Sequence, residues 1–469
     1  MPDIPPPNQT NPRTRTPSGP ALCVLAVFLA AAAALWASGF DRGRGAFDQK
    51  YYHLKAIRGF VSEWPRLDLV NYESATTPGY HIALAAAAKF VTGDALALRI
   101  AASLFTVALI WVFARAVTVR AVRSGVSLLE CTATCLPLAC SMYIVFPGVW
   151  LQPDNAGWLG VLVVLLLALR PHFGSREALM GGIVLVLLVL TRQSHVWAAS
   201  LIWVAAWLNA RPPTRDGSLS ELFSEPERRT AAALGGLLVT IPALVILAYF
   251  ARIWHGLTPP PFQAQHGSGF NWSTPPFALS LIAGYSIFLG GWLWPGLVRL
   301  SRRGWIVPTA CAAAGVGFAL IAPTTFLYEP RSSGLWNVVA FLDRHGMVIA
   351  GRTSPLIVVL SGVGAVCAAG WIELVAGRDR WVYVVAVAGF VAAQSANANA
   401  WQRYLEPFFL MVLPLMGMTG ARPAGAAVGE NIPPILVTWR VVGPVALAAG
   451  LGAITVLSLV RGEELIWPT

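Results

Sequence analysis

The amino-acid sequence predicts an all-α integral membrane protein with about eleven to thirteen transmembrane helices. Hydrophobic residues make up 56% of the 469 residues and charged residues only 12%, about half of their share in a soluble domain. Uncharged stretches such as 131–153, 230–251 and 441–460 recur along the chain, and each is about as long as a helix that crosses a bilayer. These observations exclude a soluble protein.

The apolar runs, separated by Gly, Pro and Arg residues, place the predicted spans in order along the chain. They cover 21–40, 96–118, 128–147, 155–169, 178–191, 195–209, 230–252, 277–298, 305–322, 353–375, 381–395, 403–418 and 440–460. The run from Tyr80 to Val91 is too short and alanine-rich to span easily, and it predicts an in-plane or re-entrant helix in the first outer loop, 41–95.

The ends of the chain differ in composition from the rest. Residues 1–20 are rich in Pro, Thr and Asn and predict a disordered cytoplasmic tail. The first apolar run, 21–40, is long for the apolar part of a cleaved signal peptide, which favours an uncleaved span. We expect the main transmembrane module at 21–420 and a linker with a last transmembrane helix at 421–469.

The net charge of +11 indicates topology rather than a nucleic-acid partner. If the N-terminus is cytoplasmic, every inner loop contains arginines, beginning with Arg120 and Arg123 and ending with Arg378 and Arg380. The outer segments 41–95, 253–276 and 323–352 then hold most of the acidic, aromatic and histidine residues outside the spans. Chemistry is expected at this noncytoplasmic face.

No metal site and no cofactor are predicted. The six cysteines all fall in apolar runs, without a CxxC pair and without a histidine at ligand spacing, so they are interpreted as small core residues. P-loop, GxGxxG and zinc motifs are absent from the sequence. Whether the activity requires a metal stays open.

Two aspartates are the candidate catalytic residues. Asp48 follows the first span closely, and a carboxylate with reduced hydration near the hydrocarbon boundary is a better proton acceptor for an alcohol. Asp154 reaches the same face from the turn Phe146-Pro-Gly-Val-Trp-Leu-Gln-Pro-Asp-Asn155. The alternative for both is an N-cap role, Asp48 for a helix from Gln49 to Phe60 and Asp154 for the following span.

Basic residues from several outer segments, including His345 and Arg344, form a candidate cationic rim above these acids. Arg192 lies in a tight outer hairpin, where a guanidinium must be paired or face a polar cavity. Arg403 begins a span, and the alternative for it is an ion pair with Glu406 one turn later. Together with Arg352 and His266 they suit a phosphate-bearing lipid headgroup, although solvated surface charges produce the same pattern.

Four short stretches carry a resemblance to a known family. They are Asp48 with Tyr52 and His53, then Tyr72-Glu-Ser-Ala-Thr-Thr-Pro-Gly-Tyr-His81, then Arg192-Gln-Ser-His-Val-Trp197, then Gln402-Arg-Tyr-Leu-Glu-Pro407. The sequence resembles the dolichyl-phosphate-glucose α-1,2-glucosyltransferases, which add the terminal glucose in asparagine-linked glycosylation, and more broadly the polytopic GT-C glycosyltransferases. The resemblance covers roughly residues 20–420, and it implies that the module at 21–420 is a GT-C-like catalytic module.

The resemblance implies a polyprenyl-phosphate sugar donor, an inverting mechanism and an acid in the first outer loop as the base, which matches Asp48. It also implies substrate-binding roles for residues within the matching stretches: His53, Thr77, His81 and Gln193. The sequence departs from the family where Gln49 replaces a Glu, where His53 follows the acid by five positions rather than four, and where Arg352 stands in Ala350-Gly-Arg352-Thr353.

The predicted function is transfer of a hexose from a polyprenyl phosphate to a lipid-linked or cell-envelope glycan acceptor. Arginines such as Arg192 and Arg403 would stabilise the phosphate that leaves, and Asp48 would take the proton of the acceptor hydroxyl. The alanine-rich spans and the 19 tryptophans indicate a bacterial relative, in the plasma membrane with its site on the outer side. The alternative is a transporter or flippase, for which inverted repeats and midplane ionisable residues are typical.

Overall fold

A computed structural model describes residues 17–210, 221, 223–264, 269–325, 334–421 and 432–460. Within these residues the regular secondary structure is helical, apart from one isolated β-bridge between Ile349 and Thr353. The predicted all-α fold class is therefore confirmed.

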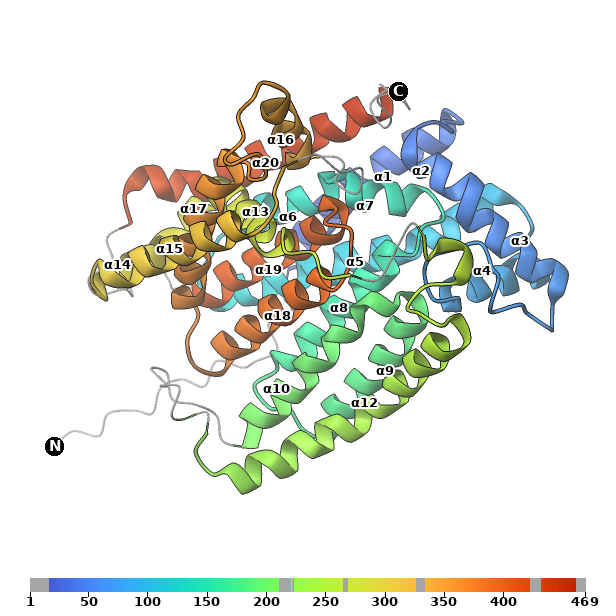
Figure 1. Ribbon diagram of the computed structural model, residues 1–469, viewed down its shortest axis with the longest axis horizontal. Helices are drawn as coiled ribbons and strands as arrows, with labels where there is room; N and C mark the ends of the chain where they lie inside the picture. The colour runs from blue at the N-terminus through green and yellow to red at the C-terminus, as the bar shows by residue number, and fades with distance from the viewer. Residues whose placement is uncertain are drawn as a thin grey trace.

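The helices follow one another through the whole described chain (Figure 1). They are α1 (Gly19–Ala37), α2 (Gly43–Asp48), the π-turn η1 (Gln49–His53), α3 (Leu54–Glu63), α4 (Gly79–Phe90), α5 (Ala95–Arg123), α6 (Leu128–Cys140), α7 (Met142–Val149), α8 (Asp154–Ala168), α9 (Ser175–Thr191), the 3-10 turn η2 (Gln193–Ala198), α10 (Ala199–Ala210), α12 (Pro226–Trp254), the 3-10 turn η3 (Pro260–Phe262), α13 (Thr274–Phe288), α14 (Gly290–Arg302), α15 (Ile306–Ile321), α16 (Leu335–Arg344), α17 (Pro355–Leu374), α18 (Gly377–Ser395), α19 (Gln402–Gly420) and α20 (Pro434–Val460).

Each predicted span coincides with one or two helices, but fewer of them than predicted qualify as membrane spans. In the described residues five helices, α1, α5, α12, α17 and α20, are long and apolar enough to cross a membrane. The count rises to seven if the bent pairs α6 with α7 and α13 with α14 each form one span; their bends are 63° and 111°. The other predicted spans are helices that are shorter or less apolar. By length and composition the chain is a multi-pass membrane protein.

Helix α19 forms the centre of the bundle. All of its residues from Tyr404 to Met418 are buried, and it contacts α5, α6, α7, α8, α13, α14, α17 and α18. In Figure 1, α9, α10 and α12 pack together on one side of it, and α13, α14, α15 and α17 on the other. Glycines permit close helix packing: a Cβ on Gly364 of α17 would lie 1.9 Å from the Leu279 carbonyl oxygen of α13.

The two ends of the bundle differ in their loops. One end gathers the arginine-rich connections, where Arg303 pairs with Glu373 at 2.9 Å and Arg440 with Glu130 at 3.9 Å. The other end holds the segment between α1 and α5 and the turns that precede α8, η2 and α19. This grouping agrees with the predicted inner and outer loops, while the side that faces the cytoplasm stays a prediction.

The segment between α1 and α5 builds a small subdomain of α2, η1, α3 and α4. Its apolar core includes Ile57, Phe60 and Leu84, and Trp254 at the end of α12 closes it by donating from Nε1 to the Leu69 carbonyl at 2.7 Å. Helix α4 corresponds to the short helix predicted at Tyr80 to Val91, whose orientation to the membrane stays a prediction. So do the domain boundaries: residues 1–16 and 422–431 lie outside the described residues, and α20 packs along α6 and α14.

Candidate active site

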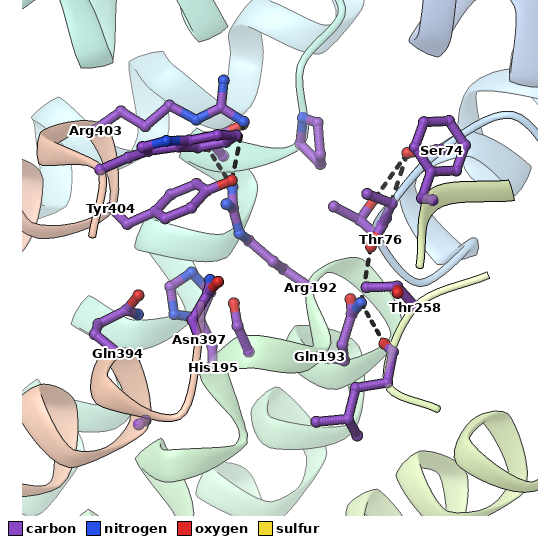
Figure 2. Close-up of a pocket in the computed structure, with 18 of the residues that line it drawn as sticks. Ser74, Thr76, Arg192, Gln193, His195, Thr258, Gln394, Asn397, Arg403 and Tyr404 are labelled. Carbon is purple, nitrogen blue, oxygen red and sulfur yellow. Dashed lines mark hydrogen bonds and ion pairs between the residues drawn. The ribbon is translucent and has the colours of Figure 1, made fainter. Parts of the chain in front are cut away.

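A cavity of about 610 Å³ lies at the end of the bundle that carries the predicted outer loops. Its walls come from α2 and η1, the first turn of α8, the hairpin between α9 and η2, the segment after α12, and the turn between α18 and α19 (Figure 2). Six predicted site residues line it: Asp48, His53, Asp154, Arg192, Gln193 and Arg403.

The side chain of Asp48 points to an arginine and not to a helix end. The chain is helical on both sides of Asp48, and its carboxylate makes no capping hydrogen bond, so the N-cap interpretation is wrong. Oδ2 of Asp48 instead lies 3.3 Å from Nη1 of Arg403 and accepts a long hydrogen bond from Gln152 Nε2 at 3.5 Å. Asp48 thus forms an ion pair inside the cavity.

A π-turn immediately after Asp48 sets which side chains share its face. The Leu54 N–H donates to the Gln49 carbonyl, a bond that spans five residues instead of four. In an α-helix two residues five apart point roughly 140° away from each other, but the wider turn brings His53 to the cavity beside Asp48. Gln49 anchors the turn, because its Oε1 accepts from Arg99 Nε at 2.9 Å.

His53 and His81 form a stacked, hydrogen-bonded pair. Nδ1 of His53 lies 2.9 Å from Nε2 of His81, and the ring planes are 14° apart. Burial lowers the pKa of His53 to about 4 and holds the pKa of His81 well below its usual range. Both rings are therefore neutral near pH 7. Only His53 lines the cavity, and His81 supports it from behind.

A second ion pair joins Asp154 to Arg192. Asp154 is the first residue of α8 after Pro153 at the cap position, and its carboxylate serves Arg192 instead of capping the helix. Both side chains are largely buried, at 13% and 10% exposed. The prediction that a nearby acid pairs with Arg192 is therefore confirmed, and both side chains line the cavity.

Tyr404 connects the two arginines. The guanidinium of Arg192 lies 4.8 Å from the centre of the Tyr404 ring, and that of Arg403 lies 4.9 Å from it. Arg403 also donates to the Tyr404 hydroxyl at 3.1 Å, and the three side chains lie together in Figure 2. One aromatic ring therefore holds both cations near each other.

The alternative pairing of Arg403 with Glu406 is wrong. Glu406 is buried in the bundle, where it accepts hydrogen bonds from Ser141 Oγ at 2.5 Å and from the Tyr285 hydroxyl at 2.9 Å. The Gln402 amide donates to it at 2.7 Å. Glu406 thus joins α19 to α13 and to the break between α6 and α7.

Gln193 and Thr77 hold the walls of the cavity together. Oε1 of Gln193 accepts from the Thr77 N–H at 2.9 Å, and its amide nitrogen donates to the carbonyls of Ala75 and Leu257, both at 2.9 Å. Thr77 is fully buried behind the wall and donates from Oγ1 to the Val189 carbonyl. The amide of Gln193 is therefore used within the protein.

The predicted cationic rim has a different composition in the structure. Arg352 does not line the cavity, because the tight turn closed by the Ile349–Thr353 bridge leaves it exposed, donating to the Ile321 carbonyl. His266 lies outside the described residues. Arg44 lines the cavity instead, near Arg403 and Asp48, and burial lowers the pKa of its guanidinium.

The sequence interpretation missed several cavity residues. They are Arg44, Trp158, His195, Gln394, Asn397, Trp401 and Tyr404. The position of Arg44, four residues before Asp48, was a usable signal, since residues at this spacing share a helix face. No sequence signal distinguishes Gln394 and Asn397 from other polar residues near a turn.

Among the described residues, no group of three or more His, Cys, Asp and Glu side chains is placed to hold a metal ion.

The comparisons with known proteins find only distant structural likeness. No model of a known protein family matches the chain, and no curated protein matches it. The chain is similar to ArnT from Cupriavidus metallidurans in its apo state, with 16% identity and a TM-score of 0.38 over 93% of this chain and 78% of ArnT. The structure of ArnT bound to undecaprenyl phosphate aligns with 14% identity and a TM-score of 0.37, over 92% of this chain and 77% of ArnT. Similarity at this level does not assign a family, and the resemblance to the dolichyl-phosphate-glucose transferases stays a prediction.

Proposed function

We propose that the chain is an inverting membrane glycosyltransferase that moves a hexose from a polyprenyl phosphate to a glycan or glycolipid acceptor. The observation that carries the proposal is the charge of the cavity. Three arginines, Arg44, Arg192 and Arg403, line it with two aspartates, Asp48 and Asp154. Three positive charges and two negative charges leave a surplus of one, which matches the single negative charge of a sugar phosphodiester.

The arginines are placed where the reaction develops charge. When the bond between the anomeric carbon and the phosphate oxygen breaks, the polyprenyl phosphate gains a second negative charge. Guanidinium groups that are already oriented stabilise that charge without reorganisation. Tyr404 supplies the orientation, since Arg192 and Arg403 both lie against its ring.

Asp48 is the proposed base. A donor phosphate competes with the Asp48 carboxylate for Arg403, and the carboxylate that is released accepts the proton of the acceptor hydroxyl. The acceptor oxygen then bonds to the anomeric carbon as the phosphate oxygen leaves from the opposite face. Asp154 remains paired with Arg192 and positions it.

The site would lie on the outer side of a bacterial plasma membrane, where a polyprenyl-linked donor and a cell-envelope acceptor both occur. The lipid tail of the donor would remain among the membrane lipids. No nucleotide or other cofactor is part of the proposal.

The test is release of undecaprenyl phosphate from undecaprenyl-phosphate hexoses by the purified full-length protein in nanodiscs that also contain glycolipids extracted from a bacterial envelope as acceptors. Arg403→Ala should abolish release, while Arg352→Ala is the matched control because Arg352 lies outside the cavity. The alternative function is tested in proteoliposomes that carry the same lipids. Movement of intact lipid across the bilayer without any cleavage would show that the protein is a flippase and not a transferase.

A further inference from the structure

The polar side chains on one wall of the cavity are already hydrogen-bonded within the protein. The Gln193 amide binds backbone groups at both of its ends. The Ser74 and Thr76 hydroxyls lie 3.2 Å apart, and Nε2 of Gln263 donates to the Trp254 carbonyl at 2.5 Å. These groups define the shape of the cavity and have little hydrogen-bonding capacity left for a ligand.

The opposite wall is different, and Figure 2 shows three of its residues, His195, Gln394 and Asn397, close together. His195 is 2% exposed, and neither of its ring nitrogens has a hydrogen-bond partner among the described residues. Gln394 is 4% exposed and lines the same part of the cavity. Oδ1 of Asn397 accepts from the Asn399 N–H at 3.0 Å, which leaves its amide nitrogen available.

The packing around His195 holds the ring in this position. The Trp158 ring lies 4.7 Å from it, centre to centre. Gly157 leaves room for it, since a Cβ on Gly157 would lie 3.0 Å from Cδ2 of His195. Buried polar groups are normally hydrogen-bonded, so a well-packed histidine without partners in a cavity wall calls for a ligand.

The wall also lacks a free charge. The two carboxylates of the cavity are both in ion pairs, Asp48 with Arg403 and Asp154 with Arg192. An ammonium group on a bound sugar would find no carboxylate on this wall, since Asp154 stays with Arg192 and the Asp48 carboxylate that the donor releases serves as the base for the acceptor. A carboxylate on the sugar would need a further positive charge, because the phosphodiester already balances the net charge of +1 that the cavity residues carry.

We propose that His195, Gln394, Asn397 and the ring of Trp158 form the subsite for an uncharged sugar. Imidazole and amide groups provide both donors and acceptors, which suits hydroxyl groups, and the indole offers an apolar surface to the sugar ring. This inference rests on the proposed function, because it places the transferred sugar next to the arginines that bind its phosphate.

The experiment compares lipids of equal phosphate charge with full-length protein in nanodiscs. Undecaprenyl methyl phosphate is a phosphodiester without a sugar, and it sets the baseline affinity. The glucose, mannose and galactose phosphodiesters are measured against it, together with the glucosamine and glucuronate forms. At least one uncharged hexose should bind about tenfold tighter than the methyl diester, the effect of one or two neutral hydrogen bonds, and the charged forms should not.

Two variants test whether this wall causes the tighter binding of the hexose phosphodiester relative to the methyl diester, called the sugar-dependent gain. Gln394→Leu should remove most of the sugar-dependent gain while the methyl diester binds as before and the melting temperature is unchanged. Gln193→Leu is the matched control, and it should lower the melting temperature because its amide bonds are internal. His195→Phe keeps a ring in place and should also remove the gain.

Each other outcome overturns a specific statement. Equal affinity for the methyl diester and all three uncharged hexoses overturns the subsite and leaves the proposed function standing, whereas no binding of any phosphodiester overturns both. Tighter binding of the glucosamine form overturns the preference for an uncharged sugar. A gain that survives both Gln394→Leu and His195→Phe places the sugar elsewhere in the cavity.

Discussion

Replacing Asp48 by asparagine separates its proposed chemistry from its role in an ion pair. The substitution keeps the size of the side chain and an oxygen that can accept from Arg403, which lies 3.3 Å away. It removes the capacity to accept a proton at neutral pH. We expect glycosyl transfer to fall about a hundredfold or more, since a positioned base contributes about 10²–10⁴ to the rate, or roughly 3–5 kcal/mol.

The expected loss of stability is smaller. The Asp48 and Arg403 side chains are 14% and 25% exposed, so their pair is partly solvated, and Arg403 keeps its contacts with Tyr404 and Trp401. Breaking a fully buried pair costs about 3–5 kcal/mol and an exposed one about 0–1 kcal/mol. This pair lies between those limits, and we expect a loss of about 1–2 kcal/mol.

Asp154→Asn is the matched comparison in the same cavity. Its pair with Arg192 is more deeply buried, at 13% and 10% exposed. We expect this variant to lose about 3–5 kcal/mol of stability, the cost of a buried charge without its partner. The rate per folded molecule should fall by less than in Asp48→Asn, because Asp154 positions Arg192 and does not take the proton.

The assay is the initial rate of undecaprenyl phosphate release at saturating donor, with a melting curve for each variant in the same detergent. A folded Asp48→Asn protein with near-normal turnover would refute the role of Asp48 as base. So would a decline in rate that follows the melting temperature equally in both variants. In either case Asp48 would be an ion-pair partner and the base would have to be sought elsewhere.

Three further predictions address the arginine site, the histidine pair and the topology. Arg192→Lys should weaken donor saturation less than Arg192→Ala if charge dominates and about equally if the planar fork does, measured by donor titration. From pH 6.5 down to about 4 the unfolded chain binds protons that His53 in the folded chain excludes. The free energy of unfolding should therefore fall on acidification by about 1.4 kcal/mol per pH unit for each such histidine, and melting curves of a His53→Gln, His81→Gln variant should show a weaker pH dependence. In a cysteine-free background, an impermeant thiol reagent should label Ser62→Cys in intact cells but not Ser301→Cys. Labelling of Ser301→Cys alone would show that the predicted topology is inverted.

Much of the architecture follows from the sequence because burial in a membrane requires long apolar helices. Every predicted span is helical, and the loops predicted to be outer do bring Asp48, Asp154, Arg192 and Arg403 to one cavity. The sequence did not predict the sharp bends inside the spans 128–147 and 277–298, because an apolar run does not reveal a bend within it. At Ser141 the chain breaks between α6 and α7, and its hydroxyl donates to Glu406, which lies 265 residues further along the chain.

The partners within the site were less predictable than its members. Arg403 is three residues from Glu406, yet it pairs with Asp48, because Glu406 points into the bundle and is satisfied by neutral donors. The ligand-binding role that we propose for His195 rests on the three-dimensional structure, in which its ring nitrogens have no hydrogen-bond partner among the described residues. No pattern of residue types along the chain encodes such an absence.

The π-turn after Asp48 determines which residue shares the cavity wall with this acid. A histidine four positions after an acid shares its face in an α-helix, whereas a fifth position turns it away. Here His53 is the fifth residue after Asp48, and the bond from the Leu54 N–H to the Gln49 carbonyl widens the turn by one residue at that point. His53 consequently reaches both the cavity and His81. The local backbone geometry therefore lets an imidazole five positions after the acid line the same wall as the acid.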